Sequence, residues 1–142
     1  MRRELPGGLE LDDDRARLDI DAVHAFISGE SYWGKGRSRE LLEHAIEGST
    51  RVLGLYDRHA QVGFARVVSD MAIVGYLADV YVLSAYRGRG LGLELVREMI
   101  TGGSCAGVRW LLHTADAQGL YAKLGFTDTA GPYPLMERPR GA

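Results

Sequence analysis

Tyr86-Arg87-Gly88-Arg89-Gly90-Leu91-Gly92 is the stretch that decides the fold, because it joins an apolar run to an amphipathic pattern. The run Val80-Tyr81-Val82-Leu83 precedes it and is typical of a buried strand. The residues after it place apolar side chains on one helical face, at Leu91, Leu95, Val96 and Met99. A glycine-rich turn at the start of a helix presents free backbone N–H groups at the positive end of the helix dipole. The sequence therefore predicts an anion site here, most often one for phosphate.

Composition indicates a single globular domain over residues 1–142. Of these residues, 46% are hydrophobic and 25% are charged, which is ordinary for a globular protein with its own core. The net charge of −2 gives no general attraction to nucleic acid or to an anionic membrane, so we expect neither as a partner. No apolar run approaches the roughly 20 residues that span a bilayer.

Three compositional features bear on compartment and source. The charged N-terminal end lacks the apolar core of a signal peptide, so we expect a cytoplasmic protein. Cys105 is the only cysteine, which excludes an internal disulfide and a multi-cysteine metal site, and we expect no metal. Asparagine is absent, and Lys35 and Lys123 are the only lysines. Because both amino acids use A-rich codons, a GC-rich bacterial source is expected.

Periodicity and turn signals predict an α/β chain. Two helices are expected first, with Asp19 and Ser38 as their N-caps and a polar loop, residues 28–37, between them. Strands are expected at residues 9–11, 51–56, 61–68, 73–83, 108–114, 126–129 and 135–138, and further helices at 90–100 and 116–124. This order predicts antiparallel hairpins followed by a parallel strand pair around the helix that follows the glycine turn.

Two common phosphate motifs fail to match the chain. A dinucleotide fingerprint needs a third glycine where Leu93 stands, and an acid about 20 residues further on, which is missing. Gly29 to Gly36 has the spacing of a nucleoside-triphosphate loop. However, Gly36 stands where a Ser or Thr must hold magnesium, and the segment follows a predicted helix instead of a strand. Both readings are therefore rejected.

Two signatures resemble those of the GNAT acetyltransferase superfamily. The first is Arg87-x-x-Gly90-x-Gly92 after a strand that ends Val82-Leu83, and it resembles the family's acetyl-CoA motif. The second is the segment Ala117 to Phe126, which looks like the family's A-x-x-L-Y-x-x-x-G-F helix and strand. They stand in the family's order with the expected strand between them. The resemblance implies a mixed, mainly antiparallel sheet with a splayed parallel pair and flanking helices.

The resemblance also implies how acetyl-CoA would be held. Backbone N–H groups would bind the CoA pyrophosphate, Arg87 and Arg89 would add charge, and Val82 and Leu83 would pair with the pantetheine arm and meet the oxyanion. The N–H groups are those of Gly88, Arg89, Gly90, Leu91 and Gly92. Tyr121 matches the family's general acid for the leaving thiolate. The cofactor would enter between strands that splay at Leu83 and Thr114, and Thr114 stands where the family often has a cofactor-binding Asn.

Candidate acceptor residues are less specific. Asp79 is a candidate base or acceptor ligand, although it could also only pair with a neighbour. His113 is a candidate base or acceptor contact, against the reading of a satisfied strand histidine. Tyr32, Trp33 and Arg37 lie in the loop that covers the acceptor in this family, and they would suit an apolar or carboxylate-bearing part. The alternative for this loop is a hydrophobic anchor beside a surface arginine.

The sequence therefore predicts an N-acetyltransferase that moves an acetyl group from acetyl-CoA to a primary amine of a small molecule. Direct attack in a ternary complex is expected, because Cys105 follows a helix-stopping glycine pair and is a poor acyl carrier. A protein or peptide N-acetyltransferase, a non-catalytic acyl-CoA sensor and a plain phosphate-binding module are the alternatives. Homodimers are common in the family. The acceptor and the acyl-chain length stay open.

Overall fold

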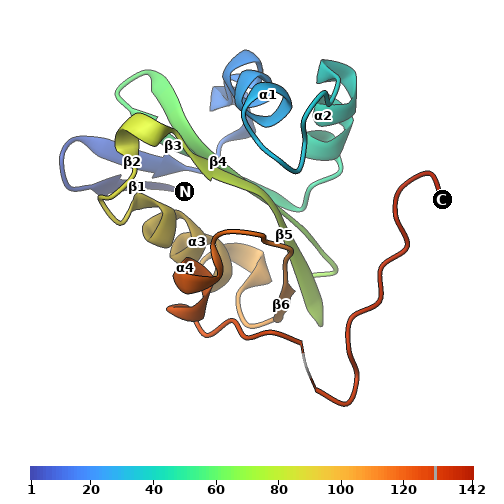
Figure 1. The fold of residues 1–142 in the computed structure, drawn as a ribbon. Coiled ribbons are helices and arrows are strands. Elements are labelled where there is room, and N and C mark those ends of the chain that lie inside the picture. Colours follow the sequence, from blue (N-terminus) through green and yellow to red (C-terminus); the bar gives the residue numbers. More distant parts are fainter. Residues whose placement is uncertain (130) are drawn as a thin grey trace.

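The structure, a computed structural model, describes residues 1–129 and 131–142 and consists of one sheet with helices on both faces (Figure 1). The strands are β1 (Arg2–Leu5), β2 (Leu9–Asp12), β3 (Arg51–Asp57), β4 (Ala60–Ser69), β5 (Val74–Val82) and β6 (Arg109–Leu111). They lie in sequence order, and every neighbouring pair is antiparallel except β5 and β6, which are parallel. This arrangement confirms the mixed α/β fold with one parallel pair.

The helices begin where the sequence supplies a cap. They are α1 (Ile20–Gly29), α2 (Arg39–Glu47), α3 (Leu91–Thr101) and α4 (Gln118–Ala122), with short 3-10 turns at Arg15–Arg17, Ser84–Tyr86 and Gly103–Cys105. The Asp19 carboxylate accepts from the Ala22 N–H, and the Ser38 hydroxyl accepts from the Leu41 N–H. Both side chains satisfy a donor that the first helical turn leaves unpaired, and this confirms the two predicted N-caps.

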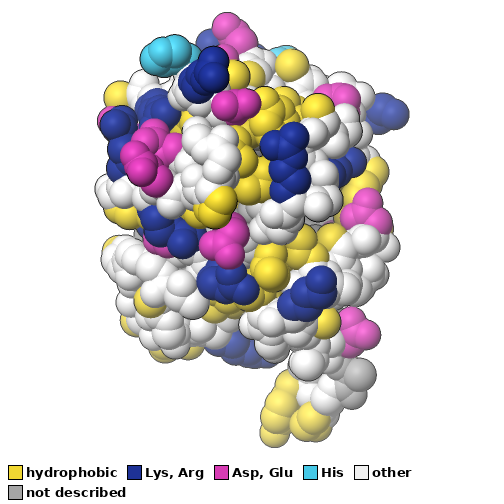
Figure 2. All heavy atoms as spheres, turned by 90° about the vertical axis from the view of Figure 1, so that its left-hand side faces the viewer, with side chains coloured by type: hydrophobic (Ala, Val, Ile, Leu, Met, Phe, Trp, Pro, Cys, Tyr) yellow, Lys and Arg dark blue, Asp and Glu magenta, His cyan; other side chains and the backbone are white. Residues whose placement is uncertain are grey.

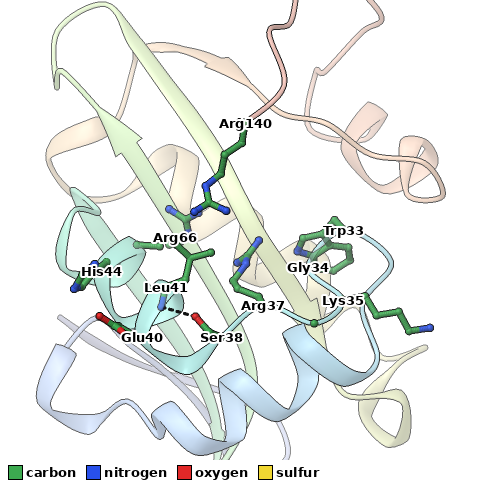
Figure 3. A pocket seen from close by; sticks show the side chains of 12 residues that line it. Trp33, Gly34, Lys35, Arg37, Ser38, Glu40, Leu41, His44, Arg66 and Arg140 are labelled. Carbon is green, nitrogen blue, oxygen red and sulfur yellow. Dashed lines mark hydrogen bonds between the residues drawn. The ribbon is translucent and has the colours of Figure 1, made fainter. Parts of the chain in front are cut away.

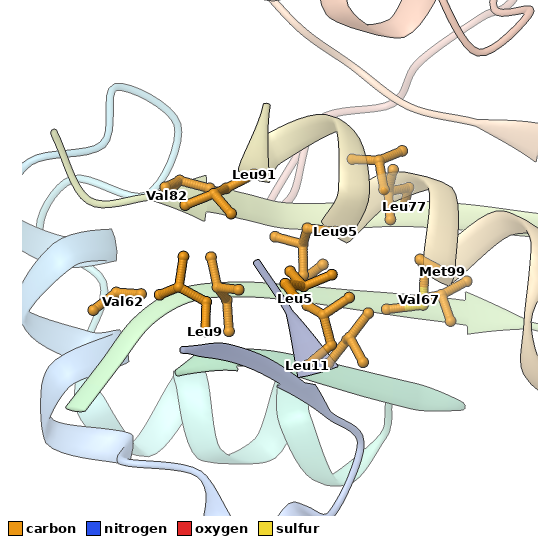
Figure 4. Close-up of a cluster of buried hydrophobic side chains, with 14 of the residues drawn as sticks. Leu5, Leu9, Leu11, Val62, Val67, Leu77, Val82, Leu91, Leu95 and Met99 are labelled. Carbon is orange, nitrogen blue, oxygen red and sulfur yellow. The ribbon is translucent and has the colours of Figure 1, made fainter. Parts of the chain in front are cut away.

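Two hydrophobic clusters cover the two faces of the sheet. The larger one lies between the sheet and α3 (Figure 4), where Leu95, Val96 and Met99 are fully buried against strand residues such as Leu53 and Leu55. The other lies beneath α1 and α2, and its buried residues are Val23, Phe26, Ile27, Leu42, Ile46, Val52, Phe64 and Tyr81. The two-sided burial fixes the faces of β3, β4 and β5, and with them the directions of the polar side chains between the apolar ones.

Strands β5 and β6 are paired only at one end. Val74 to Tyr76 pair with Arg109 to Leu111, and beyond these residues the two chains separate. The strand pair therefore splays as the sequence predicted, although β5 ends at Val82 and β6 at Leu111, before the expected Leu83 and Thr114. Residues 77–82 consequently keep one edge of their backbone unpaired by any strand in the described part of the chain.

A β-bulge in β5 changes the face that its side chains occupy. Ala78 pairs with Arg66 and Tyr81 pairs with Phe64, so β5 contains one more residue than β4 between these pairs. Asp79 lies in the bulge with a φ of 55°, a left-handed conformation that Asp tolerates better than most residues. Regular alternation from Leu77, which packs on the α3 side, would place Asp79 on that same side. The extra residue turns Asp79 toward the α1–α2 side instead.

The C-terminal part of the chain departs from the sequence-based prediction. The strands expected at 126–129 and 135–138 do not form, and most of the described residues there are exposed. Pro132, Pro134 and Pro139 remove N–H donors and restrict the backbone, which disfavours strand pairing. The sequence reading also missed β1, which pairs with β2 through the turn at Gly7 and Gly8.

Replacing Leu95 with alanine tests the core beneath α3. Leu95 is fully buried, so Leu95→Ala should lower the free energy of unfolding by about 2–5 kcal/mol in a urea titration. Ile73→Ala is the matched control, because the Ile73 side chain is largely exposed and its loss should change stability by less than about 0.5 kcal/mol. Equal effects of the two substitutions would contradict the placement of α3 on the sheet.

Candidate active site

The glycine-rich turn presents a row of free backbone donors. No N–H group from residue 88 to residue 93 donates to another group in the described part of the chain, and the Glu94 N–H makes the first helical bond, to the Gly90 carbonyl. Gly88 and Gly90 have φ values of 80° and 74°, which glycine adopts at little cost. The free donors lie at the positive end of the eleven-residue helix α3. These residues therefore fit a ligand that carries a phosphate or pyrophosphate.

Gly92 has a packing role that the sequence reading did not anticipate. A Cβ atom at this position would lie 3.1 Å from Leu120 Cδ1, so glycine lets α3 and α4 approach closely. Leu120 precedes Tyr121 in α4, and Tyr121 is buried against the α3-side cluster. The close helix contact thus holds Tyr121 at a fixed distance from the glycine turn.

The end of β5 is tied to the turn. The Arg87 Nε donates to the Val82 carbonyl at 2.9 Å, and the Arg89 guanidinium lies 5.3 Å from the centre of the Tyr86 ring. The Leu83 N–H donates to the Val62 carbonyl at 2.8 Å, so the expectation that it meets an oxyanion is wrong in this structure. Since neighbouring residues of a strand direct their N–H groups to opposite edges, Val82 directs its N–H away from β4. Val82 is the remaining donor of the two that the sequence nominated.

A cavity of about 580 Å³ lies where β5 and β6 separate. All the predicted site residues outside the glycine turn and the end of β5 line it, namely Tyr32, Trp33, Arg37, Asp79, His113, Thr114 and Tyr121. They come from the α1–α2 loop, the β5 bulge, the segment after β6 and α4. We call this space the Tyr121 cavity.

The Tyr121 side chain is suited to keep its proton. Burial raises the pKa of the phenol to about 12, and the nearby Tyr32 and Asp116 raise it further as negative charges would. The ring packs edge-on against Phe126, with 5.6 Å between the ring centres. The phenol is therefore a proton or hydrogen-bond donor over the whole physiological pH range.

Three donors converge on the Asp79 carboxylate. Trp33 Nε1 donates to Oδ1 at 2.9 Å, while Arg37 Nη1 and Arg66 Nε donate to Oδ2 at 2.8 and 2.7 Å. The carboxylate side chain is 2% exposed. Burial alone would raise its pKa, but the charges and hydrogen bonds of Arg66 and Arg37 outweigh burial and hold the pKa below its ordinary value of 3.8. A carboxylate with a lowered pKa is a weak base, so the geometry favours a positioning role for Asp79.

Thr114 and Tyr32 join the walls of the Tyr121 cavity. The Thr114 hydroxyl accepts from the Ala117 N–H at 3.0 Å and so supports the start of α4. The Tyr32 hydroxyl accepts from the Ala115 N–H at 2.7 Å, which links the α1–α2 loop to the segment after β6. Tyr32 also meets Trp33 edge-on, with 5.0 Å between ring centres.

His113 lies in a polar chain on the rim of the cavity. The Tyr76 hydroxyl and His113 Nδ1 are 2.6 Å apart, and His113 Nε2 lies 3.4 Å from Glu137 Oε2. Burial, followed by the charge of Glu137, raises the pKa of Tyr76, so this phenol stays protonated at neutral pH. The phenol and the imidazole thus share one hydrogen bond at the cavity.

Sequence reasoning missed several residues of this site. Arg66 had a signal, since it is the single charge within the apolar run Val62-Gly63-Phe64-Ala65-Arg66-Val67-Val68. Tyr76, Asp116 and Glu137 carried no comparable signal, because only the folded chain brings them to the cavity.

Surface and metal features are limited in the described residues. No helix there is long and apolar enough to cross a membrane. No group of three or more His, Cys, Asp and Glu side chains in the same residues could hold a metal ion. Figure 2 shows a face on which positive and negative side chains alternate around exposed hydrophobic ones, so charge of one sign does not dominate that face.

Asp79→Asn tests the charge cluster. Removing the carboxylate charge leaves two partly buried guanidiniums unbalanced, so the free energy of unfolding at neutral pH should fall by about 3 kcal/mol in urea titrations. Because the folded-state pKa is lowered, the carboxylate stabilises the fold above pH values near 3.8 and loses this effect as the pH falls through the folded pKa. The difference between the wild type and the variant should therefore shrink in acid.

The control for this substitution is Asp21→Asn, since Asp21 forms an ion pair with Arg39 on the surface of the molecule. Its effect should stay below about 0.5 kcal/mol. A difference between wild type and Asp79→Asn that did not change with pH would contradict the ionised state assigned to Asp79.

Known proteins share both the sequence and the fold of this chain. The family described as "Acetyltransferase (GNAT) domain" matches residues 48–128. The acetyltransferase-like protein FG08082 of Gibberella zeae is 30% identical over 138 residues, which cover 81% of this chain and 77% of the relative.

Solved structures extend the comparison over almost the whole chain. A protein of Xanthomonas campestris pv. campestris, described as an acetyltransferase of the GNAT family, is 38% identical, with 96% of this chain and 95% of the other covered and a TM-score of 0.87. A protein of Deinococcus radiodurans R1, 18% identical with a TM-score of 0.74, shares the fold over 99% of this chain and 94% of its own. The family match spans more than half of the chain, and the chain therefore belongs to the GNAT family of acetyltransferases.

Proposed function

We propose that this protein transfers an acetyl group from acetyl-CoA to the primary amine of a small molecule, by direct attack in a ternary complex. The observation that carries the proposal is the Tyr121 cavity, which opens at the splay of β5 and β6 and holds a protonated phenol. GNAT acetyltransferases use acetyl-CoA as their co-substrate, and the residues of this chain fit that molecule at two places.

The first place is the glycine turn. Its free N–H groups, residues 88–93, and the Arg87 and Arg89 side chains supply donors and positive charge for the pyrophosphate. The second place is the unpaired edge of residues 77–82, where an extended amide-containing arm can add to β5 as a strand would. Both supports the donor needs are therefore parts of the same strand–turn–helix segment.

Tyr121 and Val82 have distinct roles in the proposed transfer. The amine nitrogen forms a bond to the thioester carbonyl carbon, and the Val82 N–H stabilises the oxygen anion that develops there. The carbon–sulfur bond then breaks, and the Tyr121 hydroxyl gives a proton to the sulfur that leaves. The phenol recovers its proton from solvent after the thiol departs.

The amine must lose a proton because an ammonium has no lone pair, and a free alkyl amine has a pKa near about 10.4. His113 is the group in the Tyr121 cavity best suited to receive that proton, directly or through a water. Tyr76 bonds to its Nδ1, and Glu137 lies beside its Nε2, where it stabilises the imidazolium that forms. The weak basicity of Asp79 favours His113 over Asp79 in this role.

Thiol release and CoA binding test the proposal as a whole. CoA should raise the melting temperature of the protein, and a panel of small amines should include at least one that stimulates release of CoA from acetyl-CoA. Arg89→Gln should weaken CoA binding roughly tenfold in calorimetry, because it removes a charge from the turn. Arg97→Gln, on the exposed face of α3, is the control. No thermal shift with CoA and no amine-dependent release would overturn the proposal.

Tyr121→Phe tests the general acid. The substitution keeps the ring and its contact with Phe126, so kcat should fall roughly 100-fold while the KM for acetyl-CoA changes little. Because the pKa of the phenol is raised to about 12, wild-type kcat should show no loss from this group up to about pH 10. Tyr133→Phe, at a highly exposed position, is the control. Unchanged turnover in Tyr121→Phe would remove this role.

A further inference from the structure

A cavity of about 830 Å³ adjoins the Tyr121 cavity (Figure 3). Its walls are the α1–α2 loop, the first two turns of α2, Arg66 of β4 and Arg140 of the C-terminal segment. The charged lining residues are the cations Lys35, Arg37, Arg66 and Arg140 and one acid, Glu40. The space, which we call the arginine cavity, therefore carries an excess of positive charge.

The Arg37–Asp79–Arg66 cluster accounts for part of this excess. Two guanidiniums share one carboxylate, so one positive charge has no partner within the cluster. Arg37 and Arg66 are only 18% and 15% exposed, which means that water compensates this charge poorly. An anion in the arginine cavity would supply the missing negative charge.

Both arginines also keep unused hydrogen-bond donors. A guanidinium has five N–H donors. In the described part of the chain, the Arg37 side chain uses Nη1 on Asp79, and the Arg66 side chain uses Nε on Asp79 and Nη1 on Ser49. Figure 3 shows both side chains, with Arg140, directed into the arginine cavity. The remaining donors are those that a carboxylate or a phosphate accepts.

The start of α2 adds to the positive potential. Ser38 caps the Leu41 N–H, but the N–H groups of Arg39 and Glu40 have no acceptor in the described residues. These free groups lie at the positive end of a nine-residue helix whose first residues line the arginine cavity.

The arginine cavity and the Tyr121 cavity share a wall. Trp33, Arg37 and Arg66 line both spaces, so one molecule can extend from one into the other. The Tyr121 cavity has two acids on other elements, Asp116 after β6 and Glu137 in the C-terminal segment. Positive groups thus lie on the shared wall, and negative groups lie on walls that belong to the Tyr121 cavity alone.

We propose that the acceptor is a zwitterion whose amine lies in the Tyr121 cavity and whose carboxylate or phosphate-type group binds Arg37 and Arg66. This inference rests on the proposed acetyl transfer, which it deepens by naming the acceptor class. The acids attract the ammonium into the Tyr121 cavity before it loses its proton, and the arginines orient the other end. A polyamine has no group for the arginines and would place a second positive charge against them.

Matched acceptors give the first test. 4-Aminobutyrate should be acetylated with a kcat/KM at least roughly tenfold above that of its neutral amide, 4-aminobutyramide, because the two differ only in the charged group. 3-Aminopropylphosphonate against carboxylate acceptors distinguishes the two anionic groups, and 1,4-diaminobutane tests the opposite charge. Equal kcat/KM values for the acid and the amide, or a preference for the diamine, would overturn the inference while leaving acetyl transfer intact.

Charge variants give the second test. Arg37→Gln should remove most of the preference for the acid over the amide by raising the KM of the acid, with a smaller effect on the amide. Lys35→Gln, which leaves the Asp79 cluster untouched, should reduce the preference partly and guards against a folding defect in the first variant. Arg39→Gln, on the same helix but outside the arginine cavity, should leave the preference unchanged. An unchanged preference in Arg37→Gln and in Lys35→Gln would overturn the assignment.

Binding separates failure of this inference from failure of the proposed function. Calorimetry with 4-aminobutyrate on the CoA-saturated protein should show binding that Arg37→Gln weakens, and the amide should bind roughly tenfold more weakly. Saturation with CoA keeps the glycine turn from contributing as a second anion site. If no amine is acetylated but the acid binds selectively, the anionic subsite stands and the transfer is wrong. If neither the acid nor the phosphonate binds in preference to the amide, the subsite is wrong.

Discussion

The one extra residue in β5 is the constraint on which the acceptor side of this molecule depends. It turns Asp79 from the α3 face to the α1–α2 face, where three donors meet its carboxylate. Without the bulge, alternation would bury the carboxylate in the apolar cluster beneath α3, far from any cation that could compensate it. The left-handed backbone at Asp79 has a cost of order 1 kcal/mol, which the charge-assisted hydrogen bonds exceed.

The donor side depends on a different contact made by the same strand. β5 runs directly into the glycine turn, and the turn opens α3, whose Gly92 allows close packing against Leu120 of α4. A rigid series of packed elements therefore leads from the free N–H groups to the Tyr121 ring. This rigidity suits a site in which an acyl donor and a proton donor must be held at fixed separation.

Local signals in the sequence were sufficient for much of this architecture. The caps at Asp19 and Ser38, the glycine turn and the order of strands depend on nearby residues, and the structure confirms them. The bulge at Asp79 depends on its register with Arg66, a residue on another strand, so periodicity could not locate it. The late strands failed because a regular apolar pattern at 135–138 ignores what Pro134 and Pro139 do to the backbone. The roles of the site residues, Tyr121 among them, remain predictions.

The α1–α2 loop is attached to the sheet at few points, and this has a consequence for how the protein can change. Trp33 and Arg37 hold the loop to Asp79, and Tyr32 holds it to Ala115, while none of these contacts involves the glycine turn. Insertions or substitutions elsewhere in residues 30–38 can therefore reshape the acceptor side without disturbing the donor side. Divergence of substrate preference among relatives that keep one acyl donor needs only such a separation, and here one strand provides it by presenting its two faces to different helices.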